Sequence, residues 1–190
     1  MHSLVRFITV LLLAASASLA QAASISMTPS SLTVNQGQSF SLDINIGGVS
    51  DLYGFQVDLQ FSPSLFAVNS VSQGTLLPSG GATLFFGGDI DNTAGTVSSI
   101  ADSLTGPIAG VTGDGLLATI SFTALASGSS GIGTVNAIFL DSLGNDIVID
   151  KINTADVTVT PSAVTPIPAA VWLFGSALVS LVGVSRRKLG

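Results

Sequence analysis

The side chains that could carry out chemistry in this chain are few and of one kind. Its eleven acidic residues are all aspartates between Asp43 and Asp156, its single histidine is His2, and it has no cysteine. Between those aspartates, acid–base or nucleophilic catalysis could use only aspartate, serine, threonine, Tyr53 and Lys151. Zinc and redox metals need imidazole or thiolate ligands, which are missing there as well. The sequence therefore predicts a protein that is not an enzyme and holds no cofactor.

One short segment has the residue types of a calcium site. Asp89, Asp91 and Asn92 bring two carboxylates and an amide close together, and such oxygens can bind Ca²⁺. The segment is far shorter than an EF-hand loop, and these residues also favour turns, so we expect a turn without metal. A glycosidase would need two positioned carboxylates, but nothing in the sequence distinguishes one pair of aspartates.

Three aromatic side chains are candidate binding residues. Phe85 and Phe86 are adjacent in a strand-like segment, and because side chains alternate along a strand, one ring should point outward. That ring would contact a partner or stack on a sugar, unless a loop or a second sheet covers it. Tyr53 is the other plausible stacking ring, so an aromatic platform for sugars is poorly supplied.

The elements that must position these residues are short strands. Apolar and polar residues alternate in 38–46, 53–61 and 116–124, which predicts half-buried strands and places Phe122 in the core. Shorter candidates are 25–27, 32–34, 66–71, 82–86, 96–101, 134–140, 147–149 and 156–160. Turn residues separate them, and no stretch keeps a helical period. This pattern predicts one all-β domain, a two-sheet sandwich over residues 24–160.

Four segments of this domain, taken in order, resemble a cohesin domain. They are LTVNQGQSFSLDI (32–44), LYGFQVDLQFSPSLF (52–66), GDGLLATISF (113–122) and LDSLGNDI (140–147). The resemblance implies a jelly-roll β-sandwich of about nine strands that binds a partner and does no chemistry. Family members in cellulosomes bind dockerin modules, and related sandwiches bind polysaccharide. Phe61-Ser62-Pro63 stands where Tyr-Asp-Pro is common, and no dockerin-contact residue is assigned.

The first 22 residues have the pattern of a signal peptide for the Sec machinery. Arg6 supplies the positive start, residues 7–15 are apolar, and Ala20-Gln21-Ala22 has the small side chains of a cleavage site. We expect cleavage between Ala22 and Ala23.

A second targeting segment follows the domain. Residues 161–168 form a linker with a Pro-x-Pro motif at Pro166 and Pro168, and 169–188 predict a transmembrane helix with a basic stop. Its marker residues are Trp172, Arg186, Arg187 and Lys188. The order of these features resembles the PEP-CTERM sorting signal in its VPLPA-like variant, with Ile167 between the prolines. The resemblance implies a Gram-negative bacterium, recognition by an exosortase, transient anchoring in the membrane, and delivery to the cell surface or extracellular matrix.

Without these two ends the domain is strongly acidic. Of the five basic residues only Lys151 remains beside eleven aspartates, so the net charge is near −10. Such a surface repels phosphates, which excludes nucleic acid as a partner. The leading hypothesis is an exported, non-enzymatic cell-surface or extracellular-matrix protein with a cohesin-like module that binds another protein or a matrix component, with a dockerin-like protein or a polysaccharide as the expected kind of ligand. The alternative is a carbohydrate-binding module for exopolysaccharide or another polysaccharide.

Overall fold

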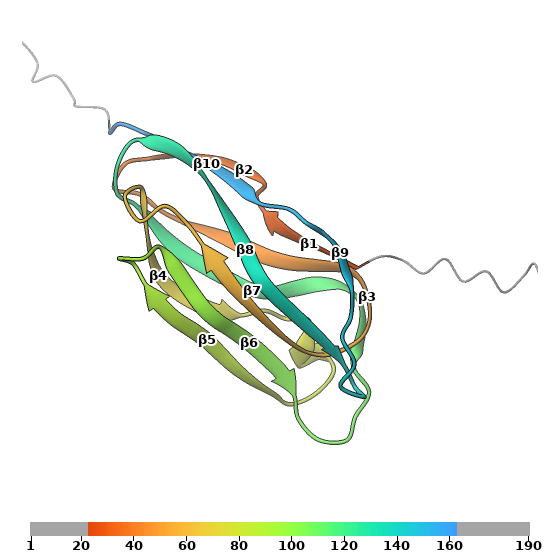
Figure 1. The fold of residues 1–190 in the computed structure, drawn as a ribbon. Coiled ribbons are helices and arrows are strands. Elements are labelled where there is room, and N and C mark those ends of the chain that lie inside the picture. Colours follow the sequence, from red (N-terminus) through yellow and green to blue (C-terminus); the bar gives the residue numbers. More distant parts are fainter. Residues whose placement is uncertain (1–22, 163–190) are drawn as a thin grey trace, which may run out of the picture.

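A computed structural model describes residues 23–162 (Figure 1). In chain order its elements are β1 (Ala23–Thr28), β2 (Ser31–Asn35), β3 (Ser39–Gln60), β4 (Phe66–Gln73), a 3-10 turn (Leu77–Ser79), β5 (Thr83–Asp91), β6 (Thr96–Leu104), β7 (Val111–Ala124), β8 (Gly128–Asp141), β9 (Ile149–Ile152) and β10 (Ala155–Thr160). The expected all-β class is confirmed, with ten strands in this part of the chain instead of about nine.

Neither of the two terminal segments expected from the sequence is among the residues that the structure describes. The signal peptide (1–22) and the apolar helix (169–188) lie outside the described residues, as do Pro166 and Pro168. Within 23–162 the structure has no helix of the length and hydropathy needed to cross a membrane. Ala23, the residue after the expected cleavage site, is the first residue of β1, and its side chain is buried.

Strand β3 is the longest element and belongs to both layers of the sandwich. Its first half pairs with β1 and β7, and its second half pairs with β6 and β8. The sequence analysis expected two strands here, 38–46 and 53–61. The structure joins them into one strand through a bulged stretch that includes Asp51, whose φ of 56° is left-handed. Bulges of this kind bend a strand, which lets β3 pass from one layer to the other.

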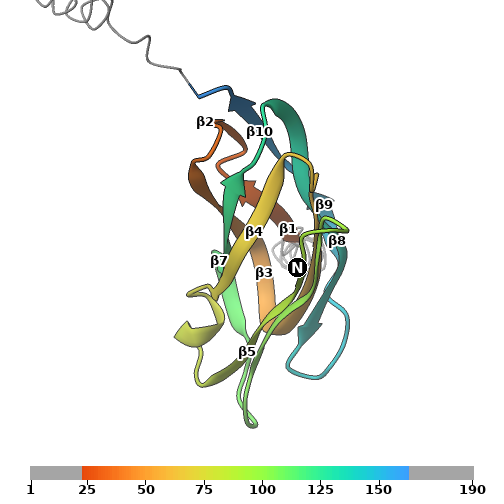
Figure 2. The ribbon, with the colours of Figure 1, turned by 90° about the vertical axis from the view of Figure 1, so that its left-hand side faces the viewer.

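The two layers follow from these pairings. The first layer has the order β4–β7–β3–β1–β9, and the second has the order β5–β6–β3–β8, with β10 and β2 added along the start of β8. Figure 2 shows β4 and β7 on one side of the molecule and β8 on the other. All neighbouring strands are antiparallel except the pairs β1–β9 and β2–β10.

The core lies between the layers and is built from the inward residue of each alternating pair. Phe122 has no exposed surface and stacks on Phe40, with ring centroids 5.2 Å apart, while Phe61 and Phe66 meet its ring edge-on. The prediction that Phe122 is a core residue is therefore confirmed. The strand candidates 82–86 and 134–140 are longer than predicted, because β5 continues to Asp91 and β8 begins at Gly128.

Candidate functional site

The outer face of the second layer carries two rows of side chains that cross four strands. Strand register places Leu84, Ser103, Gly54 and Leu140 in one row, and Phe86, Ala101, Gln56 and Ile138 in the next. Large apolar side chains stand on the outer strands β5 and β8. The middle strands β6 and β3 carry glycine, alanine, serine and one glutamine. The result is a hollow of about 460 Å³, which we call the trough.

The walls of the trough are apolar and open to solvent. Leu84 is 73% exposed, Phe86 50% and Ile138 49%. The floor is low because Gly54 has no side chain, and a Cβ at that position would lie 3.2 Å from the hydroxyl oxygen of Ser103. Contiguous exposed apolar side chains on a soluble domain usually mark a place where something binds.

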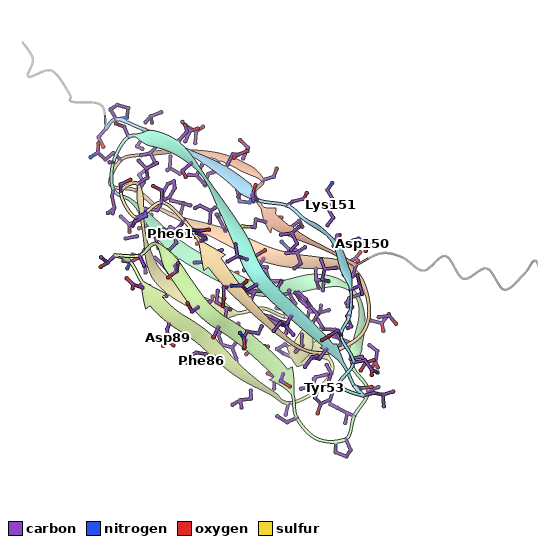
Figure 3. All side chains as sticks on the ribbon, in the orientation of Figure 1. Tyr53, Phe61, Phe86, Asp89, Asp150 and Lys151 are labelled. Carbon is purple, nitrogen blue, oxygen red and sulfur yellow. The ribbon has the colours of Figure 1, made fainter. Side chains whose placement is uncertain are left out.

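The two adjacent phenylalanines lie on opposite sides of β5. Phe86 projects from the outer face, as Figure 3 shows, and forms part of the trough wall. Phe85 points inward and packs against the core. One ring therefore faces out, as the alternation predicts. Tyr53 is half-buried: its ring packs against the core, and its hydroxyl donates a 2.6 Å hydrogen bond to the carbonyl oxygen of Gly106.

Asp58 lies beyond Gln56, at one end of the trough, and holds the strands on both sides of β3. Its Oδ1 accepts a hydrogen bond from the backbone N–H of Ser99 on β6 at 2.7 Å, and its Oδ2 accepts one from Nδ2 of Asn136 on β8 at 3.0 Å. Both partners have left-handed backbones, with φ of 60° and 49°. The carboxylate therefore stabilises two bulges that shape the trough, and both of its oxygens are already in use.

Asp51 and Asp141 lie near the other end of the trough and fasten its loops. The pKa of Asp51 is lowered by a hydrogen bond from the Ser142 hydroxyl and by one from the backbone N–H of Gly110. The pKa of Asp141 is lowered by the side-chain amide of Asn145 and by that residue's backbone N–H. These carboxylates act as anionic acceptors within loops, which is a structural role.

The Asp89–Asn92 segment forms the end of β5 and a turn. Asp91 accepts hydrogen bonds from the backbone N–H groups of Thr93 and Ala94, which lowers its pKa, while Asp89 remains in the strand and is exposed. Asn92 reaches across to β4, where its amide pairs with the backbone N–H and carbonyl of Val68. Within residues 23–162 no three acidic or histidine side chains come together as metal ligands.

A second hollow, of about 440 Å³, lies where β8 passes from β3 to β10, and we call it the glycine cleft. Its lining includes Gln60, Gly131, Gly133 and Thr154, and it shares no lining residue with the trough. Gly133 pairs with Gln60 of β3, and Gly131 pairs with Asp156 of β10. Thr134 also lines the cleft, and its hydroxyl oxygen is the one buried side-chain polar atom of the described residues without a hydrogen-bond partner.

Sequence reasoning missed most of the trough. It named Phe86 but not Leu84, Ile138 or Leu140, which complete the walls. A signal was present in two places: apolar residues recur two apart at 84 and 86 and again at 138 and 140. Each pair lies on the face opposite an inward phenylalanine, Phe85 or Phe139. A strand that is apolar on both faces is expected to pack against the core on one face and against a binding partner on the other.

The comparisons with known proteins agree with this architecture. A family model described as "Cohesin domain" matches residues 25–164. Among solved structures, a non-cellulosomal cohesin from the archaeon Archaeoglobus fulgidus has a TM-score of 0.61 at 17% identity, with 73% of this chain and 91% of that chain covered. The cohesin CaCohA2 from Clostridium acetobutylicum has a TM-score of 0.58 at 23% identity, covering 75% and 94%. Comparison with curated proteins finds no match.

A third solved structure is that of a cohesin bound to its partner. The cohesin of a type I cohesin–dockerin complex from Clostridium thermocellum has a TM-score of 0.60 at 16% identity, covering 73% of this chain and 99% of that one. Identities this low show the fold alone. The family model spans most of the present chain, and cohesin domains are binding modules without catalytic activity. The chain belongs to the cohesin family.

Proposed function

We propose that this domain binds a helical segment of a dockerin-like protein in the trough. The observation that carries the proposal is the pair of apolar walls above a floor of small residues, with exposed Leu84 and Phe86 on β5 and exposed Ile138 beside half-buried Leu140 on β8. Solved cohesins of the same fold are in complex with dockerins. The occupant is thus a protein surface with an apolar stripe.

The dimensions of the trough favour a helix as the bound element. Its walls stand three strand spacings apart, which is roughly 14 Å at about 4.8 Å per spacing. An α-helix with its side chains is about 10–12 Å wide and would lie between the walls along the strands. A bound strand is less suitable, because the backbone groups of β3 are already paired with β6 and β8.

Charge adds a second requirement for the partner. The eleven aspartates and the single Lys151 of this domain give it a field that attracts cations, and Asp89 is exposed on β5, the strand that carries Phe86 (Figure 3). A partner with basic residues beside its apolar stripe would associate faster at low salt, and the effect would shrink as screening shortens to about 8 Å at physiological ionic strength.

The test is a binding measurement with residues 23–162 and dockerin-like segments from the same genome. Phe86→Ser and Ile138→Ser should each weaken binding by about tenfold or more, because each removes an anchor from an apolar wall. Leu143→Ser is the matched control, since Leu143 is 84% exposed but lies outside the trough. If all three variants bind equally well, the trough is not the interface.

A polysaccharide is the second candidate for this domain, but the trough offers it little. Phe86 is the only aromatic ring among its exposed residues, and Tyr53 is engaged with the core and with Gly106. Sugar rings usually stack on more than one open aromatic face. The shortage of open aromatic rings therefore argues against a polysaccharide in the trough.

Export and sorting complete the proposed function. The signal-like residues 1–22 and the Pro166-to-Lys188 motif support secretion by Sec, recognition by an exosortase, and delivery to the cell surface or extracellular matrix of a Gram-negative bacterium. Mass spectrometry of the protein from its host should find Ala23 at the N-terminus and no peptide containing Trp172. A mature chain that still carries Trp172 would indicate a plain membrane anchor.

A further inference from the structure

We propose that Gln73 is a positioning residue for the trough: it holds strand β5, which carries the wall residues Leu84 and Phe86, in the position that a partner requires. The inference rests on the proposed function, because it concerns how the trough is kept ready for its partner. Gln73 is the last residue of β4, in the first layer, and is not among the residues that line the trough.

Strand β5 has the least backbone support of the four strands of the trough. β6 and β3 each have a strand on both sides. At the opposite wall, β8 pairs with β3, and its other edge is bonded by the loop that follows it, where the N–H of Ile147 donates to the carbonyl oxygen of Phe139 at 2.8 Å. β5 pairs with β6 alone, and Gly87 and Gly88, which follow the wall residues, weaken it further. Side-chain contacts must therefore fix the position of this wall.

Strand β4 lies beside β5 and provides such a contact. A Cβ at Gly87 would lie 3.4 Å from the carbonyl oxygen of Val71 on β4, so the two strands are close although they are not paired in a sheet. Nε2 of Gln73 donates two hydrogen bonds across this gap, one to the Thr83 hydroxyl oxygen at 2.6 Å and one to Oδ2 of Asp102 at 2.8 Å. Both hydrogens of the amide group are thereby used.

The bond to Asp102 anchors Gln73 firmly, because this carboxylate is buried. Asp102 is 2% exposed and is the one buried acidic residue in the part of the chain that the structure describes. Its Oδ1 accepts a 3.0 Å bond from the backbone N–H of Ser103, which is only the next residue along β6. Gln73 is thus the group that ties this carboxylate to another strand. Hydrogen bonds to charged groups are stronger than neutral ones, and a buried carboxylate that loses one is costly.

This anchor lies directly behind the first row of the trough. Thr83 precedes Leu84 on β5 and Asp102 precedes Ser103 on β6, and Leu84 and Ser103 are register partners. Because side chains alternate along a strand, Thr83 and Asp102 point inward while their neighbours face the trough. Without the Gln73 amide, β5 would keep its ladder with β6 but lose its tie to the first layer at this end. Binding would then have to order the wall, and that cost would lower the affinity.

The first test uses the free domain, residues 23–162, and amide hydrogen exchange measured by NMR. Gln73→Met keeps the length of the side chain and removes both hydrogen bonds. The exchange rates of the Leu84 and Phe86 amides should rise about tenfold, because β5 opens locally more often. The amide of Ile138, on the opposite wall, should exchange at its native rate. A rise of the same size at Ile138 would mean a general loss of stability and would overturn the proposal.

Two further variants make this result specific. Asn69→Leu is the matched control, because Asn69 also lies on β4 but its amide bonds to Thr123 on the outer face of the first layer. It should leave the β5 amides at their native rates. Thr83→Val is a gentler change that removes one of the two bonds of Gln73 and should raise the β5 rates about threefold. Native rates in both Gln73→Met and Thr83→Val, or an equal rise in Asn69→Leu, would also overturn the proposal.

The second test measures binding of the dockerin-like segment that is used for Phe86→Ser. Gln73→Met should weaken this binding by about threefold to tenfold, and the loss should largely disappear in the Phe86→Ser background. Such non-additivity is expected when one residue acts through another. Additive losses, or native binding by Gln73→Met, would contradict the positioning role. If Phe86→Ser itself binds like the native domain, the proposed function fails instead, and hydrogen exchange still decides whether Gln73 holds the wall.

Discussion

The two outer faces of this sandwich share strand β3 but differ in whether their outward side chains already bond to side chains of neighbouring strands. On the first layer its outward residues are Ser39, Ser41, Asp43 and Asn45, and three of these bond to side chains of neighbouring strands: Ser39 to Thr123, Asp43 to Thr119, and Asn45 to Thr28. On the second layer its outward residues are Gly54 and Gln56, which form the floor between the apolar walls of the trough.

This difference distinguishes a face whose polar side chains are hydrogen-bonded to one another from a face whose apolar side chains are exposed to water. The hydroxyls and amides of the first layer satisfy one another and leave little for a partner to gain. The apolar walls of the second layer have water as their neighbour, and covering them would be favourable at about 25 cal/mol per Å² of buried apolar area. One strand can serve both faces because bulges within residues 47–52 interrupt its alternation. The inward residues are even-numbered from Phe40 to Ile46 and odd-numbered from Phe55 to Leu59, and the outward residue types change as well.

The largest expected effect is on the core that both faces cover. Phe122→Ala should lower the free energy of unfolding by about 3–5 kcal/mol, because it removes a fully buried ring that contacts Phe40, Phe61 and Phe66. Denaturant unfolding of residues 23–162 measures this loss. A loss below about 1 kcal/mol, as at an ordinary surface position, would contradict the placement of the Phe122 side chain between the two layers.

The next effect separates the inner and outer sides of β5. Phe85→Ser should lower the free energy of unfolding by about 2 kcal/mol, because it places a hydroxyl where a ring packs against the core. Phe86→Ser should change it by less than about 0.5 kcal/mol and should instead weaken partner binding. Thermal unfolding and a binding assay on both variants measure the contrast. Equal destabilisation by the two would mean that the trough wall is part of the core.

A smaller effect is expected on the polar face. Thr119→Val removes the 2.6 Å hydrogen bond that the Thr119 hydroxyl donates to Oδ1 of Asp43. The free energy of unfolding should fall by about 1 kcal/mol, part of which the strand preference of valine offsets. Partner binding should be unchanged. A variant that loses binding but keeps its stability would move the interface to the first layer.

The smallest effect concerns acid. The pKa values of Asp51, Asp91 and Asp141 are lowered by hydrogen bonds to their anionic forms, so the folded state binds protons more weakly than the unfolded state. Their contribution to stability is present above the unfolded pKa of about 3.9 and is lost as pH falls through the lower folded values. Asp51→Asn keeps a residue that tolerates positive φ but removes that anion.

The melting temperature of Asp51→Asn should therefore depend less steeply on pH below about pH 4 than that of the native sequence. Melting curves recorded between about pH 2 and pH 6 provide the measurement. An identical slope in both proteins would mean that the Ser142 and Gly110 hydrogen bonds do not favour the charged carboxylate.

Local pattern made much of the fold predictable, because alternation is a property of neighbouring residues. It located the strands around Phe40, Phe55 and Phe122 and required that one of Phe85 and Phe86 face outward. The trough could not be predicted in this way. Leu84 and Ile138 are 54 positions apart, and they stand in facing walls only because β5, β6, β3 and β8 pair in one particular register. The bulges at Ser99 and Asn136 depend on Asp58 in the same long-range manner.

The position of β10 has a mechanical consequence. This strand lies between β2, to which it is parallel, and β8, to which it is antiparallel, and its last residue is held by a 2.8 Å bond from the N–H of Gln36 to the carbonyl of Thr160. Tension on the chain beyond Thr160 would act along the strand, so its hydrogen bonds to both neighbours would be loaded together in shear. If the domain is held by the chain beyond Thr160 while a partner pulls on the trough, β10 would transmit the force, and its hydrogen bonds would not break one after another from one end of the strand.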